Sequence, residues 1–246
     1  MGSNEQKGSA AAVLADLEAE ADPIRAAHSY RYFKCGPGEY GEGDRFLGVT
    51  VPKQRRIARR RRDMPLEEAK TLLRDPIHEA RLTSLFILTL KIKGKRADRQ
   101  LVDAVARLYL DNTDYVNNWD LVDSSAAEIL GPWLEERDRS LLDSLAASPS
   151  LWENRIAIIA TGHFIRRGET ADALRIASAL ASHPHDLIHN AVGWMLREVG
   201  DRDRAALESF LSRTPLPRTA LRYALEHFSA AERTVWMSAL TSGGSR

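Results

Sequence analysis

The chain has 246 residues, of which 43% are hydrophobic, enough for one or two domains with a substantial core. Its 35 Lys and Arg residues nearly balance 34 Asp and Glu, so bulk charge indicates no class of partner. One cysteine, Cys35, excludes an intrachain disulfide framework and an all-cysteine zinc site. Neither a run of about 18 apolar residues nor a signal-peptide pattern is present. We therefore expect a soluble cytoplasmic protein that does not contact membranes.

Apolar residues recur at spacings of three and four along almost the whole chain, while strand signals are nearly absent. The stretches 82–92 and 187–199 show this pattern most clearly. Helix-breaking dipeptides separate such stretches, among them Asp75-Pro76, Gly131-Pro132 and His183-Pro184. The pattern predicts an all-α domain at 10–240, between a flexible N-terminal segment at 1–9 and a flexible tail at 241–246.

A repeat becomes visible when the helical stretches are aligned. Long helices are predicted to begin near His78, Val116, Trp152, Ile188 and Pro217, spaced 29 to 38 residues apart. Shorter helices, such as 138–147 and 201–212, fill the gaps. Helical pairs at this period favour a HEAT-like solenoid, in which equivalent helices line one concave surface. An irregular helical bundle is the alternative.

Four residues in this repeat suggest a site. Trp119 and Asp123 are four residues apart, so they lie on one face of a helix. Arg155 follows Trp119 by 36 residues, and Trp194 follows Arg155 by 39, which places all four on successive long helices. A single tryptophan is more often part of a core, and an isolated Asp or Arg more often lies on a solvated surface. Their coincidence in the repeat favours a shared groove.

Basic residues are concentrated at 53–62, where seven of ten residues are Lys or Arg. Such a run can be a solvated helix face or the footprint of a phosphate backbone. Further arginines fall near equivalent ends of later helices: Arg81, Arg155, Arg166, Arg167, Arg197, Arg218 and Arg222. Arginines repeated along one face predict a basic concave groove that binds duplex nucleic acid through its phosphates.

The other motifs give weaker indications of function. The loop at 35–44 is rich in glycine but acidic and lacks the Gly-Lys-Ser/Thr ending of a phosphate-binding loop. His183, His185 and His189 are interrupted by a proline and have no accompanying carboxylate–histidine motif, so no metal is expected. Ser124 and Ser125 lack a histidine in a triad-like context, which argues against a serine hydrolase.

Several motifs together resemble one family, the AlkD-like DNA alkylation repair glycosylases. They are RYFKCGPGEYGEGDRFLGVTVPKQRR (31–56), NNWDLVD (117–123), LWENRIAI (151–158), AVGWMLREVGDRD (191–203) and PRTALRYALEHF (217–228). The resemblance spans about residues 24–240, in the same order and spacing. It implies a single-domain HEAT-like solenoid that wraps damaged duplex DNA and excises cationic N3- or N7-alkylated purines.

The resemblance also implies roles for individual residues. Asp123 matches the family's catalytic carboxylate, and Trp119 and Trp194 match the two indoles that flank the deoxyribose of the lesion. The other matching or expected DNA contacts are Arg155, Tyr32, Arg197, His163 (where some members have lysine), Arg59, Arg60, Arg218 and Arg222. The glycine-rich loop is typical of one subgroup of the family.

The chemistry that the resemblance implies needs no cofactor, because a cationic purine leaves as a neutral base without a general acid. Asp123 is expected to stabilise the positive charge that develops on the sugar and to hold the attacking water. Resemblance implies that the base stays stacked, without a base-binding pocket. We expect the protein to be a monomer. Two alternatives remain: a non-catalytic protein that binds damaged or branched DNA, and a protein-interaction solenoid of the general HEAT type.

Overall fold

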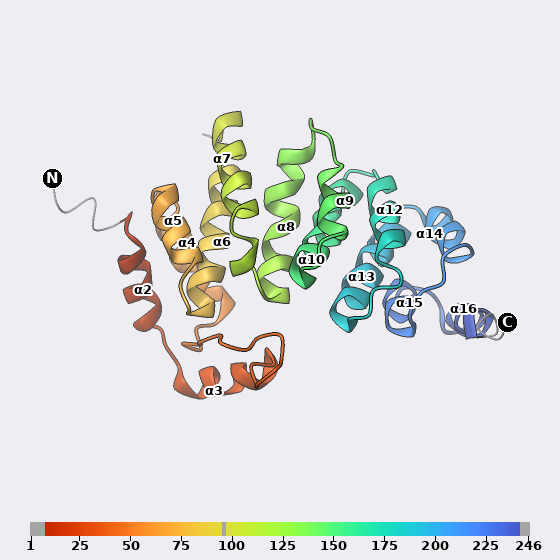
Figure 1. Cartoon of the computed structure of the whole chain (residues 1–246), viewed down its shortest axis with the longest axis horizontal. Coiled ribbons are helices and arrows are strands. Elements are labelled where there is room, and N and C mark those ends of the chain that lie inside the picture. Colours follow the sequence, from red (N-terminus) through yellow and green to blue (C-terminus); the bar gives the residue numbers. More distant parts are fainter. Residues whose placement is uncertain (1–7, 95–96, 242–246) are drawn as a thin grey trace. The chain divides into compact units, whose positions relative to one another are not determined.

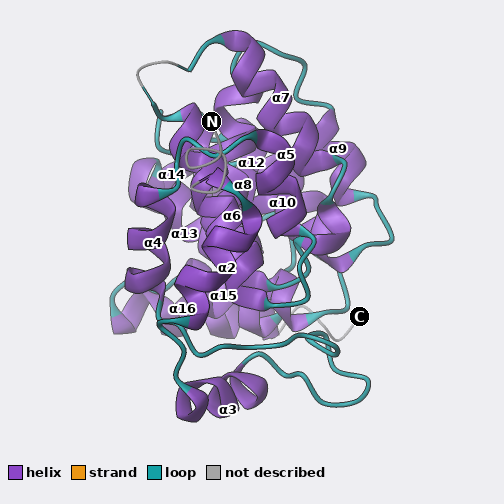
Figure 2. Cartoon of the chain, turned by 90° about the vertical axis from the view of Figure 1, so that its left-hand side faces the viewer, coloured by secondary structure: helices purple, strands orange, loops and turns teal. Residues whose placement is uncertain are grey.

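In a computed structural model, which describes residues 8–94 and 97–241, the chain folds into helices joined by loops (Figure 1). Within those ranges the only β-type pairing is an isolated bridge between Arg45 and Ile77 (Figure 2). The prediction of an all-α chain is confirmed. Most of the predicted flexible ends, 1–7 and 242–246, lie outside the described residues. Ser9, the last residue of the predicted N-terminal segment, caps the first described helix.

The chain divides into two compact units, residues 1–133 and 134–246, called the N-terminal and C-terminal units below. The N-terminal unit contains α2 (Ala10–Glu18), α3 (Pro23–Tyr32), α4 (Val51–Arg60), α5 (Leu66–Leu73), α6 (His78–Ile92), α7 (Arg99–Leu110), the 3-10 helix η2 (Thr113–Tyr115) and nearly all of α8 (Trp119–Leu134). The C-terminal unit contains α9 (Leu141–Ala146), α10 (Leu151–Ala160), α11 (Gly162–Ile165), α12 (Ala171–Ala179), α13 (Asp186–Arg202), α14 (Arg204–Leu211), α15 (Arg218–Ala224) and α16 (Ala230–Thr241).

The predicted starts of the long helices agree closely with the structure. Helix α6 begins at His78, and α10, α13 and α15 begin within two residues of the predicted positions. Helix α8 begins at Trp119 and not near Val116, because η2 precedes it and the Asn118 side chain accepts a hydrogen bond from the Trp119 N–H at 2.8 Å. Within the units, α6 packs against α4 and α5, and α13 against α12, α14 and α15. This pairing supports the predicted repeat, while the solenoid as a whole stays a prediction.

Helix α6 forms the centre of the N-terminal unit. All of its residues from 78 to 88 are buried, including the hydrophobic core residues Leu85, Ile87 and Leu88. The same stretch buries His78, Glu79 and Arg81. Burying charged groups is costly unless they are paired, so the partners of these three side chains determine what packs against α6.

Helix α3 differs from the other helices of the N-terminal unit, because it has no buried residue. Asp22 caps it and Pro23 occupies its first position. It lies crosswise to α4 and α6 and is set apart from them (Figures 1 and 2). Gly48, at φ +80°, lies so close to the start of α3 that a Cβ would come within 2.6 Å of the Ala26 nitrogen. A side chain at position 48 would therefore separate this loop from α3.

Helices α13 and α15 approach each other closely at Gly193. A Cβ on Gly193 would clash with the Ala220 carbonyl oxygen and come within 2.6 Å of the Tyr223 Cβ. The two helices therefore contact each other almost backbone to backbone, next to Trp194.

Candidate nucleic-acid interface and active site

Trp119 and Asp123 occupy the first and second turns of α8 and are both partly exposed. The Tyr32 ring meets the Trp119 ring edge to face, with centroids 5.7 Å apart and planes at 72°. Phe33 stacks on the same indole, with centroids 5.4 Å apart. The structure therefore brings two of the predicted site residues, Tyr32 and Trp119, into contact, and it leaves the Tyr32 side chain largely exposed at the end of α3.

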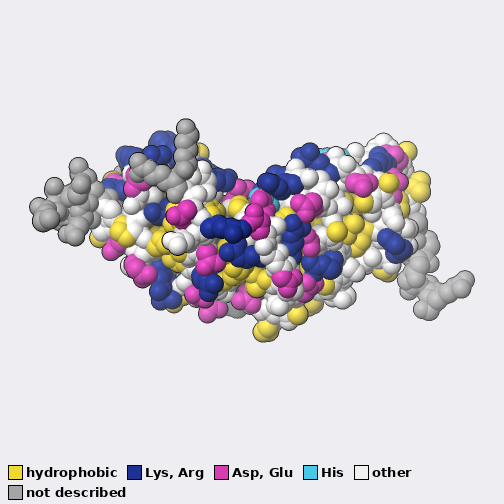
Figure 3. Space-filling model, turned by 90° about the horizontal axis from the view of Figure 1, so that it is seen from above, with side chains coloured by type: hydrophobic (Ala, Val, Ile, Leu, Met, Phe, Trp, Pro, Cys, Tyr) yellow, Lys and Arg dark blue, Asp and Glu magenta, His cyan; other side chains and the backbone are white. Residues whose placement is uncertain are grey.

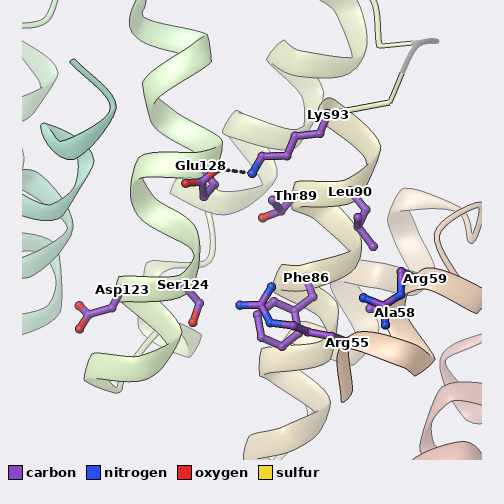
Figure 4. A pocket seen from close by; sticks show the side chains of 10 residues that line it. All are labelled: Arg55, Ala58, Arg59, Phe86, Thr89, Leu90, Lys93, Asp123, Ser124 and Glu128. Atoms are coloured by element: carbon purple, nitrogen blue, oxygen red, sulfur yellow. Dashed lines mark ion pairs between the residues drawn. The ribbon is translucent and has the colours of Figure 1, made fainter. Parts of the chain in front are cut away.

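A pocket of about 300 Å³ lies beside Asp123, between α4, α6 and α8 (Figure 4). The Arg55 guanidinium covers the Phe86 ring at 4.1 Å from its centroid, and Lys93 forms an ion pair with Glu128. Ser124 faces Arg55 across the pocket, whereas the Asp123 carboxylate points away from it. Asp123 thus lies at the edge of a pocket that arginine side chains from α4 line.

Cations of α4, and Arg61 directly after it, differ in their partners. Arg60 and Arg61 pair with Asp16 of α2 at 3.6 and 2.9 Å, and Lys53 pairs with Glu20 at 2.7 Å. Arg55 and Arg59 have no ion pair within the described part of the chain and line the pocket beside Asp123. Of the two predicted DNA contacts on α4, Arg59 is therefore available to a phosphate, and Arg60 is shared with Asp16.

Of the residues that line this pocket, Arg59 is a DNA contact expected from the sequence, whereas Arg55 and Phe86 are not, and Ser124 is considered only as a hydrolase nucleophile. Arg55 could have been found, because it precedes Arg59 by four residues in the same basic helix and so lies on the same face. Phe86 and Ser124 carry no such signal, since both fit the apolar and small-residue patterns of their helices.

A buried polar cluster surrounds His78 at the start of α6. Its Nδ1 lies 2.9 Å from Asp44 Oδ2, and its Nε2 lies 2.8 Å from Asp120 Oδ2. Arg81 donates to Asp44 and, at 2.9 Å, to Asn117. Burial alone would lower the pKa of His78, but Asp120 and Asp44 outweigh it and raise that pKa to about 9. His78 is therefore positively charged at neutral pH.

The same cluster lowers the pKa of Asp44. Burial would raise the pKa of its carboxyl, but hydrogen bonds from His78 and Arg81 outweigh burial and hold that pKa below its usual range. Two carboxylates and two cations thus meet in the interior of the N-terminal unit, between α6, α8 and the loop that follows α3. The cluster is not predictable from spacing along the sequence, because each of its contacts joins residues more than 30 positions apart.

In the C-terminal unit, the predicted residues Arg155, Trp194 and Arg197 already have protein partners. Arg155 is 4% exposed and donates to the Leu187 carbonyl, so a phosphate could reach only a small part of it. Trp194 is partly exposed, and its indole N–H donates to Glu198 at 3.0 Å. Arg197 pairs with Glu226 and with Glu198.

The remaining predicted contacts differ in their environments. His163 Nε2 lies 2.6 Å from the Glu135 carboxylate, which also pairs with Arg167 at 3.0 Å. Arg218 and Arg222 are exposed on α15 and have no ion pair among the residues described. Asp123 belongs to the N-terminal unit, whereas Arg155 and Trp194 belong to the C-terminal unit. That the three share a groove stays a prediction.

Surface charge is mixed on the face that Figure 3 shows, where Lys and Arg side chains are interspersed with Asp and Glu. This agrees with the formal net charge of +1. Arg55 and Arg59 beside the pocket are a local concentration of cations within this balance. Among the described residues, no helix combines the length and the apolar character needed to cross a membrane.

Comparisons with known proteins agree with this picture. A family model described as DNA alkylation repair enzyme matches residues 13–228, and the chain therefore belongs to this family. A solved structure, described as a predicted DNA alkylation repair enzyme from Enterococcus faecalis, shares the fold with a TM-score of 0.66. That structure is 15% identical in sequence, and the match covers 86% of this chain and 98% of the other. No curated protein matches the sequence. Family membership agrees with the predicted role in DNA alkylation repair, as an enzyme with DNA as its substrate.

Proposed function

We propose that the protein is a DNA glycosylase that hydrolyses the N-glycosidic bond of cationic N3- and N7-alkylated purines in duplex DNA. One observation carries the proposal. Asp123 lies one helical turn from the partly exposed indole of Trp119, at the edge of a pocket lined by Arg55 and Arg59. A carboxylate, an aromatic face and phosphate-binding cations are the groups that this reaction needs.

In the proposed reaction, the bond between C1′ and N9 of the alkylated purine breaks and its electron pair stays with the base. The base is already cationic, so it leaves neutral without a proton from the protein. Positive charge develops on the sugar, and the Asp123 carboxylate stabilises it. A water oxygen then bonds to C1′, and its proton passes to Asp123 or to solvent.

Trp119 serves this reaction as an electron-rich face beside the cationic sugar, a contribution of about 0.5–2 kcal/mol. Tyr32 and Phe33 contact the indole and limit its rotation. Trp194 is proposed to flank the sugar from the other side and Arg155 to anchor the adjacent backbone, as the family resemblance implies.

DNA binding is proposed to rest on phosphate contacts. Arg55 and Arg59 lie on one face of α4, without ion pairs in the described residues, and Arg218 and Arg222 are exposed on α15. The Phe86 ring is covered by Arg55, so it offers no open face on which an extruded base could stack. This favours a reaction in which the base stays in the duplex.

The test is base release from duplex oligonucleotides with N7-methylguanine, N3-methyladenine or uracil at one position, under single-turnover conditions. We expect release of both alkylated purines and little release of uracil, which leaves as an anion that no residue here would protonate. Binding of the alkylated duplex without release of either purine would refute the proposal and indicate a non-catalytic DNA-binding protein.

A further inference from the structure

His78 lies where three segments of the N-terminal unit meet. It begins α6, its Nδ1 contacts Asp44 at the end of the glycine-rich loop, and its Nε2 contacts Asp120 in the first turn of α8. The His78 side chain is 2% exposed. Asp120 directly follows Trp119, so one ring connects the loop to the turn that carries the indole.

Aromatic rings continue this connection. Phe33 and Phe46 both pack on the His78 ring, with centroids 4.7 and 4.9 Å away, and stack on each other at 5.3 Å. Phe33 also stacks on Trp119. The two phenylalanines lie on either side of the glycine-rich loop in sequence, so His78 fixes both ends of the loop.

The loop itself is an ordered structure. Its Glu39 and Glu42 carboxylates accept hydrogen bonds from the Gly36 and Gly38 N–H groups at 2.8 and 2.9 Å. Tyr40 is partly buried, and its hydroxyl forms a hydrogen bond with Trp119. Burial raises the pKa of this hydroxyl, and the hydrogen bond lowers it by less. A loop side chain therefore holds the indole N–H, while Phe33 holds the indole face.

We propose that His78 is a positioning residue for Trp119: by joining Asp44 to Asp120, it holds the glycine-rich loop against the indole. The proposal rests on the proposed glycosylase function for its catalytic consequence only. His78 has no role in the chemistry itself, since it is buried behind Phe33 and Phe46.

The charges that face His78 define how pH acts on this contact. Asp44 faces it from the loop side and Asp120 from α8, while Arg81 and Glu79 lie on α6 itself. Cys35 and Tyr40 interact with these two carboxylates, Cys35 with Asp44 and Tyr40 with Asp120. With both ring nitrogens protonated, His78 donates to both carboxylates. When it loses a proton, one carboxylate loses its donor. The loop and α8 are then joined by one hydrogen bond in place of two.

The first test follows Trp119 directly by fluorine NMR of protein labelled with 5-fluorotryptophan. The chain has five tryptophans, and Trp119→Phe assigns the resonance of interest. We expect His78→Gln to shift the Trp119 resonance and leave that of Trp194 in place. The matched control is Ser84→Ala, which removes a buried hydrogen bond of 2.6 Å from the same helix to Ala69. It should lower the melting temperature without moving the Trp119 resonance.

The second test uses pH and does not depend on the folding of His78→Gln. In the wild type, the Trp119 resonance should change with a midpoint near pH 9, set by His78. Asp120→Asn retains an acceptor for Nε2 but removes the charge that contributes most to raising this pKa. The midpoint should therefore fall in Asp120→Asn. A midpoint that is the same in both proteins, or a Trp119 resonance insensitive to pH from 6 to about 10, would overturn the proposal.

The third test measures excision of N7-methylguanine under single-turnover conditions. His78→Gln should slow excision by about 10²-fold, the effect of a small displacement of a reacting group, with unchanged affinity for undamaged duplex. Ser84→Ala should excise at the wild-type rate. A wild-type rate in His78→Gln would refute the positioning role. Absence of excision in the wild type would refute the proposed function, and the NMR result would then decide the role of His78 alone.

Discussion

The Trp119 indole meets the Tyr32 ring edge to face, with centroids 5.7 Å apart, although α3 buries none of its own residues. The end of α3 is thus held to α8 by aromatic contacts and not by a hydrophobic helix face. Tyr32 remains 65% exposed in this position. Tyr32 and Trp119 therefore form an aromatic surface that is accessible to a ligand.

Replacing Asp123 with Asn tests the proposed catalysis. The substitution keeps the size of the side chain and removes its charge, so binding of alkylated duplex should survive. Excision should fall by about 10²-fold or more, equivalent to about 2.7 kcal/mol in the barrier. Single-turnover release of N7-methylguanine measures this. Asp114→Asn, an exposed position in η2, is the control. Excision at the wild-type rate by Asp123→Asn would refute the mechanism.

Replacing Arg59 with Ala tests the proposed DNA interface. Arg59 has no ion pair in the part of the chain described, so its loss should weaken binding to damaged and undamaged duplex equally. The slope of log affinity against log salt should decrease by about one unit. Arg107→Ala on α7, whose guanidinium pairs with Asp103, should leave the slope unchanged. Weaker binding of damaged DNA alone would contradict the assignment.

Glu79 should be among the strongest contributors to the stability of the N-terminal unit. Its buried carboxylate accepts hydrogen bonds from the backbone N–H groups of Leu47, Gly48 and Val49, at 2.7 to 3.2 Å. Glu79→Ala leaves these donors without their acceptor, at a cost of about 3 kcal/mol or more in the free energy of unfolding. Urea denaturation measures the change.

The control for Glu79 is Glu67→Ala. Glu67 is exposed and pairs with Lys70 at 3.7 Å, so the substitution should change stability by less than about 0.5 kcal/mol. Equal stability of the two variants would show that the loop at 47–49 does not depend on Glu79.

The pKa of His78 also makes stability depend on pH. Folding raises this pKa from 6.5 to about 9, so the folded chain holds the proton more tightly than the unfolded chain. The stabilisation is complete below pH 6.5 and is lost as pH rises towards 9. Urea denaturation of the wild type should therefore give lower midpoints across this range. In His78→Gln this contribution should be absent, and a decline of the same size there would assign it to other groups.

Helix positions were predictable from sequence, because they depend on local periodicity and on punctuation by glycine and proline. The start of α8 was misplaced by three residues, since Val116 fits the apolar pattern and the capping of Trp119 by Asn118 is a side-chain contact. Cap contacts of this kind decide boundaries that apolar spacing leaves open.

The environment of each site residue was less predictable. Arg155 and Arg197 fit a basic repeated face in sequence, yet they contact Leu187 and Glu226, 32 and 29 residues away. The His78 cluster likewise joins residues 34 and 42 positions apart. Spacing along a helix gives the face that a side chain occupies, but only tertiary packing gives its partner.

The close approach at Gly193 ties the position of Trp194 to a helix beyond it in the chain. Since no methyl group fits between Gly193 and α15, a larger residue at 193 requires the segment 220–223 to move. Positions 193, 220 and 223 should therefore change together, if at all, in related sequences. A chain that ends before Arg218 would also lack the surface on which the Trp194 turn of α13 rests, even though every deleted residue follows Trp194 in the sequence.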